Sequence, residues 1–380
     1  MTIARAACIS DLRTIAKRRI PRFAFDLVDG GAEDESNLRR NEDALQALRL
    51  TPRYLVDASR PRLETEIFGQ TYSAPFGIAP IGMLNVFWPG ADLMLARLAA
   101  KHNVPYCVSA AASTSLERLA EAADGRGWFQ LYASADHAVT DGLLDRAQAA
   151  GYRNLLVTVD VPAAGKRDRD IRNELSVPFK FTPRTLVDLG LHPRWSLATL
   201  RHGKPNIANY ADLLKSATSY AEVQATLIAA DYTWDHLIKL RDRWPGRLIV
   251  KGLQHAEDAA RCAELGCDGI VVSNHGGRQV AAGPGSIEAL PAIAKAVADR
   301  IKILFDSGIR RGSDIIRAKA LGADFTLLGR SFAYGVGAGG ATGADRAFTI
   351  IELELTRSLG QLGRPDFANV DETLIHRGTP

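Results

Sequence analysis

Residues 248–277 read LIVKGLQHAEDAARCAELGCDGIVVSNHGG, and this stretch holds one full repeat of the pattern that decides the fold. Two short apolar runs, Leu248–Lys251 and Gly269–Ser273, flank Ala256–Leu265, whose apolar residues recur every three or four positions. A run that is apolar on both faces is typical of a buried parallel strand, and the longer period is typical of a helix. The stretch therefore predicts a strand, a helix and a second strand.

Runs of this kind occur eight times from Pro75 onward, and helical patterns follow them. Eight strand–helix units predict an α/β fold, the closed TIM (β/α)8 barrel. A doubly wound parallel sheet is the alternative, but it rarely continues so regularly through eight units. The runs are Pro75–Pro80, Pro105–Ser109, Trp128–Tyr132, Leu155–Val159, Leu248–Lys251, Gly269–Ser273, Lys302–Asp306 and Phe325–Gly329.

The rest of the chain surrounds this repeat, and we predict a single domain over 1–380. The barrel is expected over 75–335, with C-terminal helices over 336–380. Residues 1–74 are expected to form a mainly helical preface, with helices at Ile9–Arg18, Arg22–Val28 and Glu33–Leu48.

A long insertion, at about 162–245, follows the fourth strand, and a connection of this length needs a functional reason. Its first half, Ser176–Asn206, mixes apolar side chains with five basic residues and a single acid, Asp188. This mixture fits two alternatives, a lid packed on the barrel mouth or an anchor on a membrane surface. The basic residues are Lys180, Arg184, Arg194, Arg201 and Lys204.

Composition narrows the classes of function. A net charge of +4 over 380 residues argues against a dedicated nucleic-acid binder. The four cysteines form no C-x-x-C pair, so we expect reduced thiols, no metal site and a cytoplasmic protein. The N-terminus lacks an apolar signal core and no apolar run is long enough to span a bilayer, which leaves peripheral attachment to the inner membrane surface open.

Polar residues follow nearly every predicted strand, at the face of a TIM barrel that carries active sites. A stable core does not place polar groups at every strand end, so their joint occurrence indicates function. These residues are Gln130, Tyr132, Thr158, Asp160, Lys251, Ser273, Asn274, His275, Asp306, Gly329 and Arg330.

Two segments offer acid–base chemistry and a carboxylate clamp. In SNHGGRQ at 273–279, His275 can accept a hydroxyl proton near neutral pH and Arg278 can hold a carboxylate through two hydrogen bonds. In TVDVPAAGKRDRDIRN at 158–173, Asp160 can stabilise a histidinium and Arg167 can supply a second guanidinium. Alternatively, Arg167 is a solvated charge in a basic run and Asp160 caps the next segment.

A third pair of segments predicts a phosphate site. FDSGIRRG at 305–312 follows the seventh strand and LGR at 328–330 follows the eighth, where TIM barrels bind phosphate groups. Gly308, Arg310, Gly329 and Arg330 are the candidates. Lys251 can place a cation beside a flavin and stabilise the negative charge of its reduced ring.

Together these segments closely resemble the FMN-dependent 2-hydroxy-acid oxidase and dehydrogenase family, which includes glycolate oxidase, mandelate dehydrogenase and bacterial FMN-linked L-lactate dehydrogenase. The resemblance runs from Pro21, with GGAEDE at 30–35, to the last helices, and SNHGGRQ is highly specific to the family. HPRWSLATLRHGKPNIANY at 192–210 is most similar to the lactate and mandelate dehydrogenase branch, some members of which are membrane-associated.

The resemblance implies a role for each matching residue. His275 would be the active-site base paired with Asp160, and Tyr132, Arg167 and Arg278 would bind the substrate. FMN would contact the backbone of Pro80, Ile81 and Gly82. Its other contacts would be Ser109, Gln130, Thr158, Lys251 and Ser273, and its phosphate would lie against Asp306, Ser307, Gly308, Arg310, Gly329 and Arg330.

The implied activity is oxidation of a lactate-like or aryl L-2-hydroxy acid to the 2-oxo acid, as an oxidase or a dehydrogenase. Electrons would pass to oxygen, a quinone or a redox protein, and the family implies a homotetramer. Two alternatives remain within the fold, a tailoring oxidase acting on a larger molecule and a non-catalytic flavin-binding protein. A flavin-free barrel enzyme that handles phosphates is a third.

The chain departs from the family pattern at several positions. Leu27 stands where the N-terminal helix usually carries a substrate-binding tyrosine, Ala281 replaces an aspartate, and Ser307 replaces a glycine. Ala111 stands at an aromatic pocket position of glycolate oxidase. Together these changes predict a roomier, less polar pocket and a bulkier substrate. Gly82, where oxidases often have alanine, favours a dehydrogenase.

Overall fold

The computed structural model of the chain describes every residue except 1, 175–181, 204–205, 211–228 and 377–380. Within the insertion, Lys180 and Lys204 therefore lie outside the described residues, and so does the side chain of Arg184.

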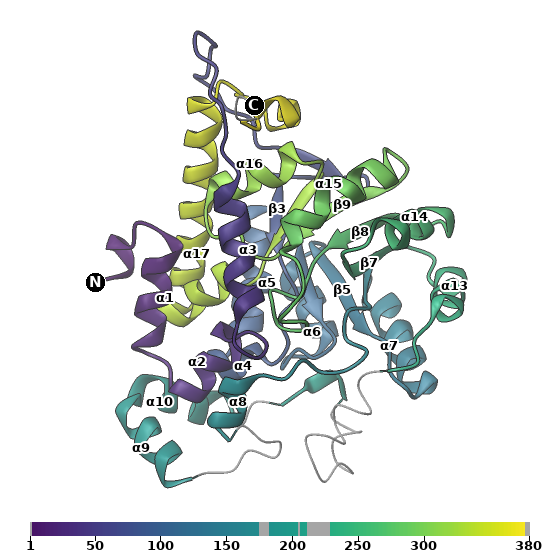
Figure 1. The fold of residues 1–380 in the computed structure, drawn as a ribbon. Coiled ribbons are helices and arrows are strands. Elements are labelled where there is room, and N and C mark those ends of the chain that lie inside the picture. Colours follow the sequence, from purple (N-terminus) through teal and green to yellow (C-terminus); the bar gives the residue numbers. More distant parts are fainter. Residues whose placement is uncertain (1, 175–181, 204–205, 211–228, 377–380) are drawn as a thin grey trace.

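Eight parallel strands close into a barrel, which confirms the predicted TIM architecture (Figure 1). The order around the barrel is β10-β3-β4-β5-β6-β7-β8-β9, so the last strand pairs with both the first and the seventh. The strands are β3 (Phe76–Ile78), β4 (Tyr106–Ser109), β5 (Gly127–Tyr132), β6 (Asn154–Thr158), β7 (Arg247–Leu253), β8 (Gly269–Val272), β9 (Lys302–Asp306) and β10 (Phe325–Leu328).

Helices cover the outside of the barrel, and this burial explains why the strands are apolar on both faces. Every residue of β4, β6, β8 and β10 is buried. The covering helices are α5 (Ala91–His102), α6 (Leu116–Ala123), α7 (His137–Ala149), α13 (Trp234–Arg243), α14 (Ala256–Glu264), α15 (Ser286–Val297), α16 (Gly312–Ala320) and α17 (Arg330–Gln361).

Helix α17 follows β10 directly and continues into the C-terminal region, through non-helical backbone at Gly339 and Gly340. Two 3-10 turns, Phe367–Asn369 and Glu372–Leu374, come after it. The label α17 therefore covers two helices joined by a kink at Gly339 and Gly340: the first begins directly after β10, and the second is the long helix expected in the C-terminal region.

The preface contains the three predicted helices, α1 (Ile9–Lys17), α2 (Arg22–Asp29) and α3 (Ser36–Ala47), after a 3-10 turn at Ile3–Arg5. Helix α1 packs along α17, as Figure 1 shows, and α2 packs against α4 (Leu84–Phe87) and α8 (Asp168–Arg172). The preface thereby brings α2 to the cavity at the barrel mouth.

The preface also contains a β-hairpin that sequence patterns did not predict, made of β1 (Thr65–Ile67) and β2 (Gln70–Tyr72). Its side chains join the cluster that fills the barrel interior: the indole Nε1 of Trp128 donates to the hydroxyl of Tyr72 at 3.0 Å. Three-residue strands are too short to display an alternating pattern, and the turn uses Phe68 at φ 53° instead of the usual asparagine or aspartate.

The insertion adds α8, α9 (Pro183–Leu191), α10 (Pro193–His202) and a 3-10 turn at Ala208–Tyr210. Trp195 attaches α10 to the body of the protein, because its indole Nε1 donates to the Phe87 carbonyl at 3.0 Å and its ring meets Phe23 edge-on. No helix among the described residues is long and apolar enough to cross a bilayer.

Candidate active site

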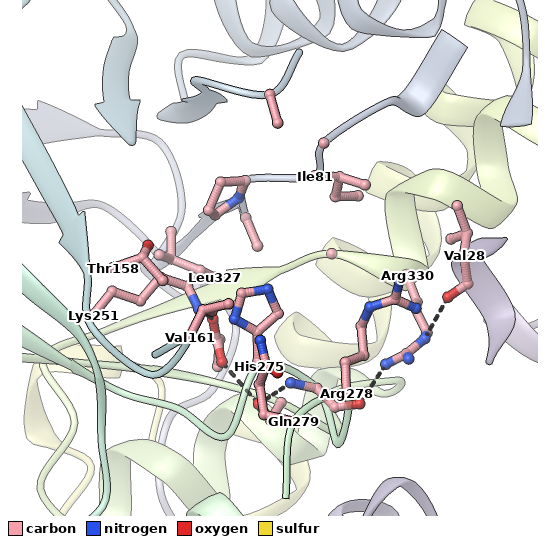
Figure 2. A pocket seen from close by; sticks show the side chains of 18 of the residues that line it. Val28, Ile81, Thr158, Val161, Lys251, His275, Arg278, Gln279, Leu327 and Arg330 are labelled. Carbon is pink, nitrogen blue, oxygen red and sulfur yellow. Dashed lines mark hydrogen bonds and ion pairs between the residues drawn. The ribbon is translucent and has the colours of Figure 1, made fainter. Parts of the chain in front are cut away.

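A cavity opens at the carboxyl ends of the barrel strands and holds about 1500 Å³ of empty space, including its mouth. Its wall comes from the loops and strand ends on which the predicted polar residues lie. Figure 2 shows His275, Arg278 and Lys251 gathered at this cavity, with Arg330 beside Val28. Most of the predicted residues are thus brought together, although they come from seven different strands and the insertion.

His275 follows β8 and adopts a left-handed backbone conformation, with φ 58°. Its Nδ1 lies 3.0 Å from Asp160 Oδ1, and its Nε2 lies 3.4 Å from the hydroxyl of Tyr132. This pairing orients the imidazole so that Nδ1 carries the proton toward the carboxylate and Nε2 is free to act as a base.

The electrostatic surroundings keep this imidazole neutral. Burial lowers the pKa of His275, and the positive charges of Lys251 and Arg278 lower it further, while Asp160 partly opposes them. Burial by itself raises the pKa of Asp160, but His275 and Lys251 outweigh that effect and hold it below its usual value. The pair is therefore a neutral base beside an ionised carboxylate at neutral pH, as general-base catalysis requires.

Two guanidinium groups lie next to this base. Arg278 is held by a hydrogen bond from its Nη1 to the Gly30 carbonyl at 2.8 Å, and burial, then Arg167 and Arg330, lower its pKa. Arg167 has a buried Nε with no hydrogen-bond partner among the described residues, and its Nη1 lies 3.6 Å from Asp170. Two largely buried guanidinium groups with one nearby carboxylate, that of Asp170, form a site that is suited to an anion.

Lys251 supplies a buried cation on the β7 side of the cavity. Its Nζ lies 2.9 Å from Ser273 Oγ and 3.1 Å from Asp306 Oδ2. Burial alone lowers the pKa of Lys251, but Asp306 and Asp160 outweigh burial and raise it above its usual value. The side chain therefore stays charged.

Three of the predicted FMN contacts lie behind the cavity wall instead of on it. Ser109 donates to Gln130 Oε1 at 3.0 Å, and Gln130 Nε2 donates to Thr158 Oγ1 at 2.9 Å. Thr158 lines the cavity. Ser109, Gln130 and Ser273 are fully buried behind the wall, and each is hydrogen-bonded to a residue that lines it. They hold the residues of the wall in position.

The loops after β9 and β10 form the other end of the cavity. Gly308 adopts φ 89°, and a Cβ at this position would lie 2.6 Å from the Asn41 carbonyl, so only glycine fits. Helix α17 begins at Arg330, immediately after Gly329, so the positive end of its dipole lies at this wall. A glycine turn beside a helix N-terminus is suited to a phosphate group.

The two arginines predicted at the phosphate already have partners within the chain. Arg330 donates from Nε to Val28, from Nη1 to Gly276 and from Nη2 to Gly30, each through a backbone carbonyl at 2.8 Å. Arg310 pairs with Glu42 at 2.9 Å. Both line the cavity, so a phosphate would meet their charge while their side chains brace the loops and the preface.

The residues present fit FMN. The cavity combines a phosphate cradle at Gly308, a buried lysine and a close backbone approach at Gly82, where a Cβ would lie 3.0 Å from Ala111 Cβ. The described residues hold no group of three or more His, Cys, Asp or Glu side chains placed to bind a metal.

The departures from the family pattern do not all act on the cavity. Leu27 and Ala111 line it and make that part of the wall apolar, together with Val161 and Ile207. Ala281 is outside the lining, and its carbonyl accepts a hydrogen bond from Ser36 at 3.0 Å. The expectation that Ala281 enlarges the pocket is therefore wrong, and Ser307 adds a hydroxyl to the wall instead of making it less polar.

A buried amide network that anchors the histidine loop was missed. Asn274 Nδ2 donates to Asn41 Oδ1 at 2.7 Å and to Asn37 Oδ1 at 2.9 Å, and Asn41 Nδ2 donates back to Asn274 Oδ1 at 2.9 Å. The spacing of Asn37 and Asn41 by one helical turn was the only available signal, and polar residues on a helix are usually solvated. The network fixes α3 to the loop that carries His275.

Sequence reasoning also missed two contacts of the insertion. Ile207 enters the cavity wall because Asn209 holds its segment to the loop after β4, donating from Nδ2 to the Ala110 carbonyl at 3.1 Å. Gln279 accepts a hydrogen bond from the Gly165 backbone at 2.8 Å and ties the loop of Arg167 to that of Arg278.

A barrel mouth that combines a phosphate cradle, a buried lysine and a histidine–carboxylate pair defines a class, the flavin-linked TIM-barrel oxidoreductases. Comparison with known proteins narrows the assignment. The chain belongs to the FMN-dependent dehydrogenase family, whose model matches residues 16–377. FMN is therefore its cofactor, and the flavin-free alternative is wrong.

Individual relatives cover almost the whole chain. An (S)-mandelate dehydrogenase of Pseudomonas putida is 42% identical over 367 residues, which is 95% of this chain and 92% of that protein. An L-lactate dehydrogenase of Caulobacter vibrioides is 38% identical over 375 residues, 98% of each. A crystal structure of the monotopic membrane protein (S)-mandelate dehydrogenase superposes with a TM-score of 0.93 at 38% identity, covering 98% of this chain and 99% of that one.

Proposed function

We propose that this protein oxidises a bulky L-2-hydroxy acid of the mandelate type to its 2-oxo acid, with FMN bound at the barrel mouth and His275 as the base. The observation that carries the proposal is the 3.0 Å contact between His275 and Asp160, made beside the guanidinium groups of Arg167 and Arg278. A carboxylate held by the arginines presents its neighbouring hydroxyl to the imidazole.

Each side chain then has one task. Arg278 and Arg167 bind the substrate carboxylate, and Tyr132, whose pKa burial raises to about 12, remains a hydroxyl donor. His275 Nε2 takes the hydroxyl proton, and Asp160 stabilises the imidazolium that forms. FMN, when bound, would supply the two-electron oxidant for the substrate's C2 carbon. Lys251 provides a fixed positive charge for the reduced ring.

The size of the substrate follows from the apolar wall. Leu27, Ala111, Val161 and Ile207 line the same cavity as the two arginines, and none of these four side chains carries a polar group. Such a wall gains from burying an aryl group, at roughly 25 cal/mol per Å² of apolar surface. The mandelate dehydrogenase relative agrees with an aryl acid, and L-lactate is the second candidate because other relatives act on it.

A substrate panel tests this proposal. The FMN-loaded protein is mixed anaerobically with (S)-mandelate, L-lactate and glycolate, and flavin absorbance is followed. We expect (S)-mandelate to bleach the flavin faster than lactate, and glycolate to be slowest. A yellow protein that none of these acids bleaches would instead favour the tailoring oxidase or the non-catalytic flavin-binding protein.

We also propose that α9 and α10 rest on a membrane surface. Five apolar side chains on these two helices are about half exposed or more: Leu186, Val187, Leu191, Leu197 and Leu200. Trp195 holds the helices to the body, and Arg194 and Arg201 add positive charge for anionic lipids. The relative described as a monotopic membrane protein supports this interpretation over a lid alone.

Charged substitutions separate the anchor from the lid. Leu191→Glu with Leu200→Glu should release the protein from anionic vesicles in a sedimentation assay. Leu353→Glu, at an exposed leucine of α17, is the matched control and should leave binding unchanged. Equal vesicle binding by both variants would argue against the anchor.

The homotetramer and the electron acceptor remain proposals that rest on family resemblance, and the single domain remains one that rests on the regular strand–helix repeat. Analytical ultracentrifugation measures the oligomeric state. Turnover with oxygen compared with a quinone analogue separates an oxidase from a dehydrogenase, and Gly82 favours the quinone or a redox protein. Cell fractionation tests a cytoplasmic location at the inner membrane surface.

A further inference from the structure

A closed ring of hydrogen bonds links Lys251 to the loop that carries the base. Lys251 Nζ donates to Ser273 Oγ at 2.9 Å, and the same oxygen accepts the His275 backbone N–H at 3.0 Å. On its other side, Lys251 lies 3.1 Å from Asp306 Oδ2. Asp306 therefore contacts the Lys251 ammonium group directly, and the His275 backbone is linked to the same group through Ser273.

Ser307 closes this ring. Its hydroxyl donates to Asp306 Oδ1 at 2.8 Å and accepts the Gly276 backbone N–H at 3.0 Å. The two consecutive amides of the histidine loop are thus each bound to a serine hydroxyl, and both serines connect to the Lys251–Asp306 pair. A glycine at position 307 would leave Asp306 Oδ1 without this donor and the Gly276 amide without this acceptor.

The backbone of Ser307 is held in a conformation that serine rarely adopts, with φ 85°. Side chains other than glycine are strained in this region, and such strain persists where surrounding contacts or function require it. A glycine would adopt this backbone conformation without strain, whereas the serine is strained but makes the two hydrogen bonds of its hydroxyl.

We propose that Ser307 is a positioning residue that couples the cation beside FMN to the placement of the catalytic base, an inference that rests on the proposed function. By donating to Asp306, the hydroxyl disperses the negative charge of that carboxylate, so the field of Lys251 toward the flavin is less neutralised. By accepting from Gly276, it holds His275 in its left-handed turn.

Two substitutions separate this role from a purely structural one. Ser307→Gly and Ser307→Ala both remove the hydroxyl, but only glycine adopts a positive φ without strain. We expect the glycine variant to melt at a higher temperature than the alanine variant. Both should shift the reduction potential of bound FMN to the same more negative value, measured by reductive titration without substrate. Both should also slow flavin reduction by (S)-mandelate about fivefold to tenfold, with KM changed less than twofold.

Ala298→Gly is the matched control, because Ala298 has φ 49° on an exposed turn and no side-chain hydrogen bond to lose. It should raise the melting temperature and leave the potential unchanged. The proposal would be overturned if the reduction potential of FMN followed the melting temperature instead, so that the Ser307→Gly variant had the wild-type potential. If the wild type binds FMN but no 2-hydroxy acid reduces it, the proposed function fails, while the potentials still test the ring.

Discussion

Asp160 and His275 lie 115 positions apart in the chain, yet Asp160 Oδ1 approaches His275 Nδ1 to 3.0 Å across the barrel mouth. The contact joins the end of β6 to the loop after β8. Asp160 Oδ2 is buried without a hydrogen-bond partner among the described residues, so the histidine is the main support for this carboxylate. Removing either partner leaves a buried polar group unsatisfied.

Asp160→Asn should reduce the rate of flavin reduction about a hundredfold or more, while FMN stays bound. Asp160 raises the pKa of His275 against the effect of burial, so its loss lowers that pKa further. The base must be neutral to act, and activity falls as the pH drops through the pKa. The acid limb of the pH–rate profile should therefore move to lower pH as the plateau falls. A limb that moves to higher pH would contradict this assignment.

Leu27→Tyr should improve the oxidation of small acids. Leu27 lines the cavity on α2, and a tyrosine hydroxyl there can donate to a substrate carboxylate. One such hydrogen bond contributes roughly 1–2 kcal/mol, which corresponds to a gain of about fivefold to thirtyfold in kcat/KM for L-lactate. Leu27→Phe is the control, since it adds the ring without the hydroxyl. Equal kinetics of the two variants would show that the hydroxyl does not reach the substrate.

Gly165→Ala should weaken substrate binding without removing FMN. A Cβ at Gly165 would lie 2.2 Å from the Arg278 carbonyl, so the loop of Arg167 must move away from that of Arg278. We expect KM for (S)-mandelate to rise about tenfold, the equivalent of one weakened charged hydrogen bond. Gly142→Ala on α7, where a Cβ meets nothing within 4 Å, should leave KM unchanged. An unchanged KM in both would place the two arginines outside the carboxylate site.

Asp92 should make folding stability depend on pH. Burial raises its pKa to about 7, and its Oδ2 accepts the backbone amides of Ser113 and Thr114 while Oδ1 has no described partner. The folded protein therefore keeps a proton on Asp92 that the unfolded chain releases near pH 4. As a result, the free energy of unfolding falls as the pH rises above about 4, until Asp92 ionises in the folded protein at about pH 7. Asp92→Asn removes the ionisable group, so the change that it causes in the free energy of unfolding should be more stabilising at pH 8 than at pH 5 by about 1–3 kcal/mol.

Chemical denaturation at the two pH values measures this difference. Gly142→Ala, which changes no titratable group, is the control and should alter the free energy of unfolding equally at both pH values. A stabilisation by Asp92→Asn that is equal at pH 5 and pH 8 would mean that Asp92 is already ionised at the lower pH.

The barrel was predictable because each strand is buried on both faces, and such strands are apolar throughout. The clustering of polar side chains at the cavity was predictable because many of them follow those strands directly, as His275 follows β8. The hairpin at Thr65–Tyr72 was not, since three-residue strands carry too few positions for a period.

The parts of the site that escaped prediction depend on partners distant in sequence. Asn41 and Asn274 stabilise each other only after α3 has packed on the histidine loop, 233 positions away. Ile207 reaches the cavity because Asn209 binds the loop after β4. Asparagines on a helix are ordinarily solvated, and an isoleucine is ordinarily part of a core. Only tertiary contacts bring these residues into the site.

The proposed function requires His275 to be the base in oxidation of a 2-hydroxy acid. Anaerobic stopped-flow mixing of (S)-mandelate with the FMN-loaded wild type and with His275→Gln measures this role. The flavin absorbance of the wild type should bleach as fast as the enzyme turns over. The variant should retain FMN, but (S)-mandelate should reduce that FMN at least about a hundredfold more slowly. Reduction of the variant's flavin at the wild-type rate would exclude His275 as the base.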